Sequence, residues 1–163
     1  MTSKTEFSTE EWTRLKRAPF VAGMAISIAD PGGPIEVVKE TAATLKTVRE
    51  AASSGGRGEL VDAVARDVVA DTRLRKSPLH DFKAKGALAG QEILEELAEV
   101  SRLVSAKATP EEADAYRGWL RDAAQEAANA AKEGGFMGFH AERVSEGEQR
   151  MLDKLAEVLA SPD

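Results

Sequence analysis

The chain has 163 residues and a net charge of −6, from 22 basic and 28 acidic side chains, and it contains no cysteine. The length suits one domain with its own core. Without thiols, disulfides, thiolate metal sites and a cysteine nucleophile are excluded, and the acidic balance disfavours nucleic acid as a partner, because phosphate binding needs exposed Lys and Arg.

No segment is long and apolar enough to cross a membrane. The longest uncharged stretch covers residues 18–29, whereas a spanning helix needs about 20 apolar residues. The first residues show no signal-peptide pattern, so we expect a soluble, cytoplasmic protein. Aromatic residues make up only 5% and strand-type alternation is missing, which predicts an all-α fold.

The predicted helices start at an S-x-x-E capping box, Ser8 to Glu11, which predicts a short first helix. Pro19 is expected to end it and to open a second helix that runs to Ala29. The second helix is apolar nearly all round, so we expect it in the middle of the bundle.

The third helix is predicted from Pro34. Spacings of three and four residues indicate a buried stripe of Ile35, Val38, Ala42, Leu45 and Ala52. A Gly- and Ser-rich break at 53–58 predicts a flexible link. The fourth helix follows from Glu59, with an expected inward face of Leu60, Val61, Val64 and Val68.

The fifth helix is predicted from an N-cap at Ser77, with Gly86 and Gly90 on its buried stripe. Glycine weakens a helix by about 1 kcal/mol relative to alanine, so we expect these glycines to allow close approach of the sixth helix, 109–132. The acidic side chains of the fifth helix are expected to face solvent: Glu92, Glu95, Glu96 and Glu99.

A long apolar connector, 133–144, precedes a second capping box at Ser145 and Glu148, which starts the last helix. Helix–helix connections are usually polar and two to eight residues long. This one could therefore form a core plug, or it could form a surface that contacts a partner or ligand through Phe136, Met137, Phe139, His140 and Arg143. The whole chain, 1–163, is predicted to be a single bundle of six or seven helices.

The run from Ala130 to Phe139, followed by the segment 143–148, resembles a motif shared by small uncharacterised all-helical bacterial proteins with the pattern EGGF-x-GF…VS-x-x-E. That resemblance implies a helical fold and no particular activity. A weaker similarity, around Ala29, Asp30 and Glu36, is to helical domains of tellurite-resistance type, whose acidic residues are implicated in metal binding.

Three carboxylates after the second predicted helix allow two interpretations. Asp30, Glu36 and Glu40 could supply oxygen ligands to a divalent cation such as Mg²⁺ or Ca²⁺. Alternatively, Asp30 ends a helix at a proline turn, and the two glutamates stand in the first turns of the next helix, where its dipole favours them. No other cofactor is indicated.

Five basic residues gather in an otherwise acidic chain: Arg73, Arg75, Lys76, Lys83 and Lys85. They could attract an acidic partner or a phosphorylated ligand, or they could simply keep a turn solvated. A di-iron bundle site is excluded, because neither histidine belongs to a Glu-x-x-His motif.

These observations predict a non-enzymatic helical bundle that acts by self-association, as a homo-oligomer, or by binding another protein. The alternative is a carboxylate-based divalent-metal or small-ligand site near Asp30, Glu36 and Glu40.

Overall fold

The computed structural model of the chain describes residues 2–30, 34–132 and 144–161, without the side chains of Pro34, Glu36 and Lys132. Within these ranges every regular element is helical, which confirms the predicted all-α class. The elements are η1 (Lys4–Glu6), α1 (Thr9–Ala29), α2 (Pro34–Ser54), α3 (Glu59–Arg73), η2 (Gly86–Leu88), α4 (Ala89–Lys107), α5 (Pro110–Lys132) and α6 (Glu146–Val158).

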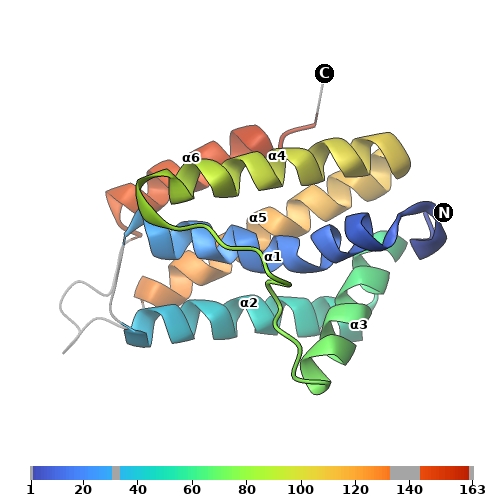
Figure 1. Cartoon of the computed structure of the whole chain (residues 1–163), viewed down its shortest axis with the longest axis horizontal. Helices are drawn as coiled ribbons and strands as arrows, with labels where there is room; N and C mark the ends of the chain where they lie inside the picture. The colour runs from blue at the N-terminus through green and yellow to red at the C-terminus, as the bar shows by residue number, and fades with distance from the viewer. Residues whose placement is uncertain (1, 31–33, 133–143, 162–163) are drawn as a thin grey trace.

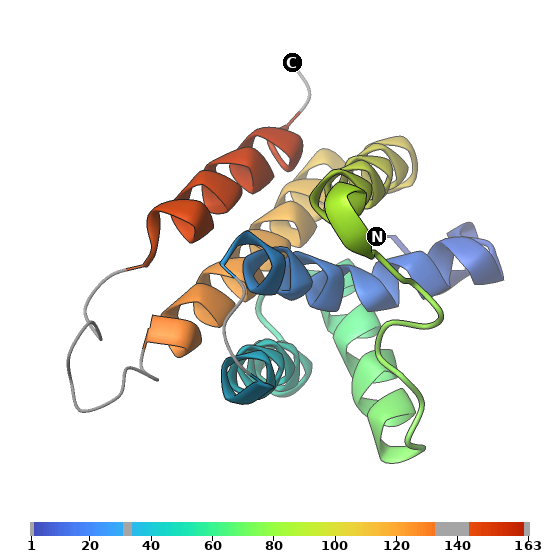
Figure 2. The ribbon, with the colours of Figure 1, turned by 60° about the vertical axis from the view of Figure 1, so that its left-hand side comes forward.

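Helix α1 lies at the centre of the arrangement, as its apolar character predicts. It contacts all five other α-helices, with α4 and α6 on one side of it and α2 and α3 on the other (Figure 1). When the molecule is turned, α1 is still enclosed between α2, α4 and α5 (Figure 2). Its buried side chains are Trp12, Leu15, Ala18, Pro19, Phe20, Val21, Ala22, Ala25 and Ile26.

The prediction of two helices on either side of Pro19 is wrong, because one continuous helix runs through it. Proline has no N–H, so the carbonyl of Leu15, four residues earlier, loses its helical donor. The hydroxyl of Tyr116 on α5 donates to this carbonyl at 2.6 Å. A donor from a distant helix thus replaces the bond that Pro19 removes.

Helix α2 buries a different face from the predicted one. Ile35 and Val38 are 69% and 67% exposed, and the buried positions are Glu40, Thr44, Thr47, Val48 and Ala51. The hydroxyls of Thr44 and Thr47 donate to carbonyls one turn earlier in the same helix. Because their polar hydrogens are satisfied within α2, these threonines can pack against the small residues of α1 and α5.

The predicted helix start at Ser77 is also wrong. Residues 74–85 form an irregular connector that crosses over α1 between α3 and α4 (Figure 1). Three of its residues, Arg75, His80 and Asp81, have positive φ angles of 55°, 44° and 66°, which a continuing α-helix does not allow.

Gly90 is the first-turn glycine of α4, and its close neighbour is α6 rather than the predicted sixth helix. A Cβ atom on Gly90 would lie 3.7 Å from Cε of Met151. That is an ordinary contact distance, and a Cβ atom on Gly86, which lies in η2, would meet nothing within 4 Å. The prediction that these two glycines allow close approach of the helix 109–132 is therefore wrong.

Both predicted capping boxes are present. Ser8 accepts a hydrogen bond from the N–H of Glu11 that begins α1, and Ser145 does the same with Glu148 at α6. In each box the glutamate accepts in return from the serine N–H. These reciprocal bonds fix where α1 and α6 begin.

Candidate functional site

The predicted contact residues of the long connector, Phe136, Met137, Phe139, His140 and Arg143, lie outside the described residues. Their proposed role as partner or ligand contacts therefore stays a prediction.

The predicted carboxylate site is only partly described. Asp30 is an exposed residue at the C-cap of α1, and the side chain of Glu36 lies outside the description. Glu40 is 3% exposed and accepts a hydrogen bond from the hydroxyl of Ser27. Among the described residues, no group of three His, Asp or Glu side chains is arranged to hold a metal ion, so the divalent-metal site also stays a prediction.

Glu96 corrects the expectation that the acidic residues of α4 all face solvent. Its side chain is 8% exposed and pairs with Arg17 at 2.7 Å and Arg14 at 3.2 Å, both on α1. The guanidinium of Arg17 also lies over the ring of Phe82, 5.3 Å from its centroid. Glu96 therefore joins α4, α1 and the connector, and has a structural role.

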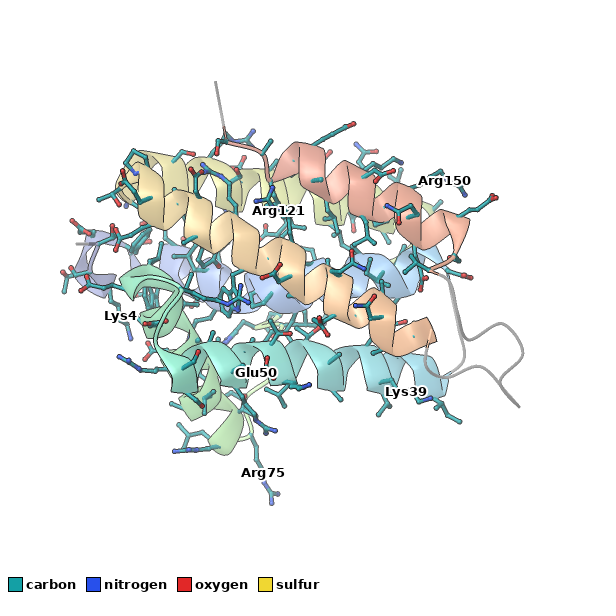
Figure 3. All side chains as sticks on the ribbon, turned by 180° about the vertical axis from the view of Figure 1, so that it is seen from behind. Lys4, Lys39, Glu50, Arg75, Arg121 and Arg150 are labelled. Atoms are coloured by element: carbon teal, nitrogen blue, oxygen red, sulfur yellow. The ribbon has the colours of Figure 1, made fainter. Side chains whose placement is uncertain are left out.

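The predicted basic patch lies at the C-terminal end of α3 and on the connector that follows. All five of its residues, Arg73, Arg75, Lys76, Lys83 and Lys85, are exposed. Arg75 points away from the body of the molecule beyond the end of α3 (Figure 3). Lys76 pairs with Asp71 at 3.4 Å.

Arg73 belongs to a larger feature that sequence reasoning missed, a groove of about 690 Å³ between α2 and α3. We call it the α2–α3 groove. Arginines stand along it, Arg49 from α2 and Arg66 and Arg73 from α3, around a floor that includes Ala52, Val69 and Ala70. Arg66 and Arg73 are seven residues apart, which places them on one helix face, but only the folded chain brings Arg49 beside them.

The three groove arginines form no ion pair with any described side chain. Two of the acidic residues of α3 are paired with other cations. Asp67 binds Lys4 of η1 at 2.6 Å and accepts from the indole N–H of Trp12 on α1, and Asp71 binds Lys16 of α1 at 2.5 Å.

These pairings keep both aspartates ionised. Burial tends to raise the pKa of Asp71, but the hydrogen bond from Lys16 and the charges of Lys16 and Lys76 outweigh it, so the pKa is lowered. The pKa of Asp67 is lowered in the same way, through Lys4 and the indole N–H of Trp12. Asp67 and Asp71 of α3 are thus paired with lysines, whereas Arg66 and Arg73 on the same helix form no ion pair with a described side chain.

His80 of the connector stands 3.5 Å from Asp71 and completes this cluster. Burial lowers its pKa, and the charge of Lys16 lowers it further, against the opposite effect of Asp71. Lys16 and Lys76 already neutralise the charge of Asp71, so a neutral imidazole of His80 fits beside this carboxylate.

Comparison of the chain with protein-family models, with curated proteins and with solved structures gives no match. The resemblance to small helical bacterial proteins and to tellurite-resistance-type domains therefore stays a prediction. No helix among the described residues is long and apolar enough to cross a membrane.

Proposed function

We propose that this chain is a non-enzymatic binding protein and that its α2–α3 groove binds an acidic segment of a partner protein. The observation that carries the proposal is the set of three exposed arginines, Arg49, Arg66 and Arg73, that line one groove without an ion pair to any described residue. The chain as a whole has an excess of acidic residues. The three arginines therefore lack an ion pair with a described residue although the chain is rich in carboxylates.

The chemistry of the groove suits carboxylates. A guanidinium presents a planar fork of donors that matches a carboxylate in a bidentate arrangement. The Cα atoms of Arg66 and Arg73 are separated by two helical turns, roughly 10 Å along the axis of α3. This spacing suits several acidic groups in a row better than one compact anion.

The apolar residues of the groove imply that the partner segment also carries apolar side chains. Ala52, Val69 and Ala70 offer small apolar surfaces between the arginines. A segment that alternates acidic and apolar side chains would place carboxylates on the arginines and apolar groups on this floor. Because the arginines are exposed, binding should be modest in affinity and sensitive to salt.

The test is fluorescence anisotropy with a labelled glutamate-rich peptide that contains interspersed leucines, at low and at physiological salt. A triple substitution removes the groove charge, and a matched one removes three charges elsewhere, on α2, α4 and α6. The groove variant is Arg49→Gln, Arg66→Gln and Arg73→Gln, and the control is Lys46→Gln, Arg102→Gln and Arg150→Gln.

Both variants shift the net charge from −6 to −9, since each removes three positive charges. We expect the groove variant to weaken binding about tenfold or more and the control to change it about twofold or less. Equal losses in the two variants would show a general charge effect and would contradict the groove as the site. Sedimentation of the protein alone shows whether the acidic partner is a second copy of this chain.

A further inference from the structure

The wall that α3 contributes to the α2–α3 groove has a regular pattern. Arg66, Val69, Ala70 and Arg73 all line the groove, and they stand at positions i, i+3, i+4 and i+7 of one helix. Residues at these spacings form a single stripe on a helix face. The stripe is positively charged at both ends and apolar in the middle, and it is roughly 10 Å long.

The wall from α2 repeats this composition in a shorter form. Arg49, Ala52 and Ser53 line the groove from positions i, i+3 and i+4 of α2. Arg49, like Arg66 and Arg73, is exposed and forms no ion pair with a described side chain. Both walls therefore offer guanidinium groups together with small apolar side chains.

The other hydrogen-bond donors of the two walls are already used inside the protein. The hydroxyl of Ser53 donates to the carbonyl of Arg49 at 2.8 Å. The hydroxyl of Thr72 donates to the carbonyl of Val68 at 2.9 Å. Every lining residue lies beyond the first turn of its helix, so its backbone N–H is bonded to the carbonyl one turn earlier. Among the described groups of the groove, the guanidiniums are thus the donors that remain for a ligand.

An extended segment would meet these walls with unpaired backbone groups. The N–H and C=O groups of a strand point sideways and pair with the edge of another strand, whereas the two described walls are helices. A helix bonds its own N–H and C=O groups. It can therefore lie in the groove and present only side chains, which avoids the cost of unpaired backbone groups away from water.

We infer that the acidic partner segment of the proposed function is an α-helix with the pattern acid-x-x-apolar-apolar-x-x-acid, an assignment that rests on that function. Two helices that lie side by side have the same rise per residue. Acids seven residues apart therefore reach Arg66 and Arg73, and the apolar pair between them covers Val69 and Ala70. Acidic and apolar side chains then alternate at helical spacing and not residue by residue. Arg49 adds a positive charge from the α2 wall.

Three capped peptides of identical composition, each about 15 residues long so that a helix can form, separate these patterns. The first repeats Glu-Gln-Ala-Leu-Leu-Ala-Gln, which places glutamates seven residues apart with leucines at i+3 and i+4. The second arranges the same residues with glutamates and leucines in strict alternation. The third keeps the glutamates seven apart and moves the leucines to i+2 and i+5, on the opposite helix face.

Fluorescence anisotropy should show that the first peptide binds about tenfold or more tightly than the other two. Circular dichroism should show a gain of helix when this peptide is mixed with the protein. Equal or tighter binding of the alternating peptide, or no gain of helix, would overturn the helical assignment and leave the proposed function intact. Equal binding of the third peptide would refute the order of acidic and apolar residues. Absence of binding by all three peptides would contradict the proposed function as well.

An exchange of charges tests the contacts with α3. Arg66→Glu together with Arg73→Glu should weaken binding of the first peptide about tenfold or more, and a peptide with lysines in place of the glutamates should bind this variant instead. Lys83→Glu together with Lys85→Glu makes the same change in net charge at exposed positions outside the groove lining, and this control should still prefer the glutamate peptide. All four positions are exposed, so both variants should fold. If the two variants prefer the same peptide, the pairing with Arg66 and Arg73 is wrong.

Discussion

The hydroxyl of Tyr116 donates to the carbonyl of Leu15 at 2.6 Å, the carbonyl that Pro19 leaves without a helical donor. Tyr116 is fully buried, and this burial raises the pKa of its phenol well above 10.0, so the hydroxyl remains a donor at any pH where the protein is studied. The proline in α1 and the tyrosine in α5 therefore form one unit, although they are far apart in the sequence.

Removing the Tyr116 hydroxyl should expose this dependence. Tyr116→Phe leaves the Leu15 carbonyl buried without a donor, which should lower the free energy of unfolding by about 1–3 kcal/mol. In a Pro19→Ala background the alanine N–H restores the helical bond, so the same substitution should cost clearly less. Denaturant unfolding of the four proteins in this cycle measures the coupling, and equal costs in both backgrounds would show that Pro19 and Tyr116 are independent.

This pair also shows why the beginning of α1 was predicted correctly and the predicted end of that helix at Pro19 was wrong. The capping box at Ser8 and Glu11 is local, because four consecutive residues contain all of it. The continuation through Pro19 depends on a donor 101 residues away from Leu15, which no local pattern reveals. The buried face of α2 was missed for a related reason, since Thr44 and Thr47 satisfy their own hydroxyls and pack as if they were apolar.

The candidate sites follow the same division. Arg73 was recognised as part of a basic run, because its neighbours lie close in sequence. Arg49 and Arg66 were not, because the α2–α3 groove exists only once the two helices pack.

Glu96 should be a larger contributor to stability than its exposed neighbours on α4. Glu96→Ala leaves Arg17, which is 17% exposed, without its carboxylate, and we expect a loss of about 2–3 kcal/mol in the free energy of unfolding. Arg14 is more exposed and can be solvated, so the loss in the free energy of unfolding should be smaller than for a fully buried ion pair. Glu99→Ala removes an exposed pair with Arg102 and should cost about 0.5 kcal/mol or less, so similar losses would contradict the structural role of Glu96.

The aspartate cluster on α3 should give an acid-sensitive contribution to stability. The pKa of Asp71 in the folded protein lies below its ordinary value of 3.8. Its pairing therefore stabilises fully at pH well above 3.8, weakens as the pH falls through 3.8 towards the lowered pKa, and contributes nothing below both values. Asp71→Asn should lower the melting temperature at neutral pH, and the difference from the wild type should shrink as the pH is lowered below 3.8. A constant difference at all pH values would contradict this linkage.

His80 offers a direct reading of the same cluster by NMR. Its pKa should lie below the ordinary value of 6.5, because burial and the charge of Lys16 both lower it. Replacing Asp71 by asparagine removes a neighbouring charge that raises this pKa, so the pKa of His80 should fall further, whereas Lys16→Met should raise it. The second histidine of the chain, His140, can be assigned by a His140→Gln variant. A shift in the opposite direction in either variant would show that the cluster is not arranged as described.

The contact between Gly23 and Thr44 should be intolerant of a methyl group. A Cβ atom at Gly23 would lie 2.5 Å from Oγ1 of Thr44, far inside contact distance. Although alanine is intrinsically favoured over glycine in a helix by about 1 kcal/mol, Gly23→Ala should destabilise the protein by about 1–3 kcal/mol through this clash. Adding Thr44→Ala removes the clashing Oγ1 atom. The double variant should therefore recover most of the lost stability, as measured by its melting temperature. Failure to recover would place the strain elsewhere.

The threonines that face inward from α2 have a consequence for local motion. Among the described residues of α2, only Val48 and Ala51 are buried apolar side chains. The packing of α2 therefore buries less apolar surface than the packing of α5 does. Regions with little buried apolar surface open at lower free energy than the global unfolding, and we expect amide hydrogens of α2 to exchange with solvent before those of α5. Because the α2–α3 groove uses α2 as one of its walls, an acidic segment bound there would slow that exchange.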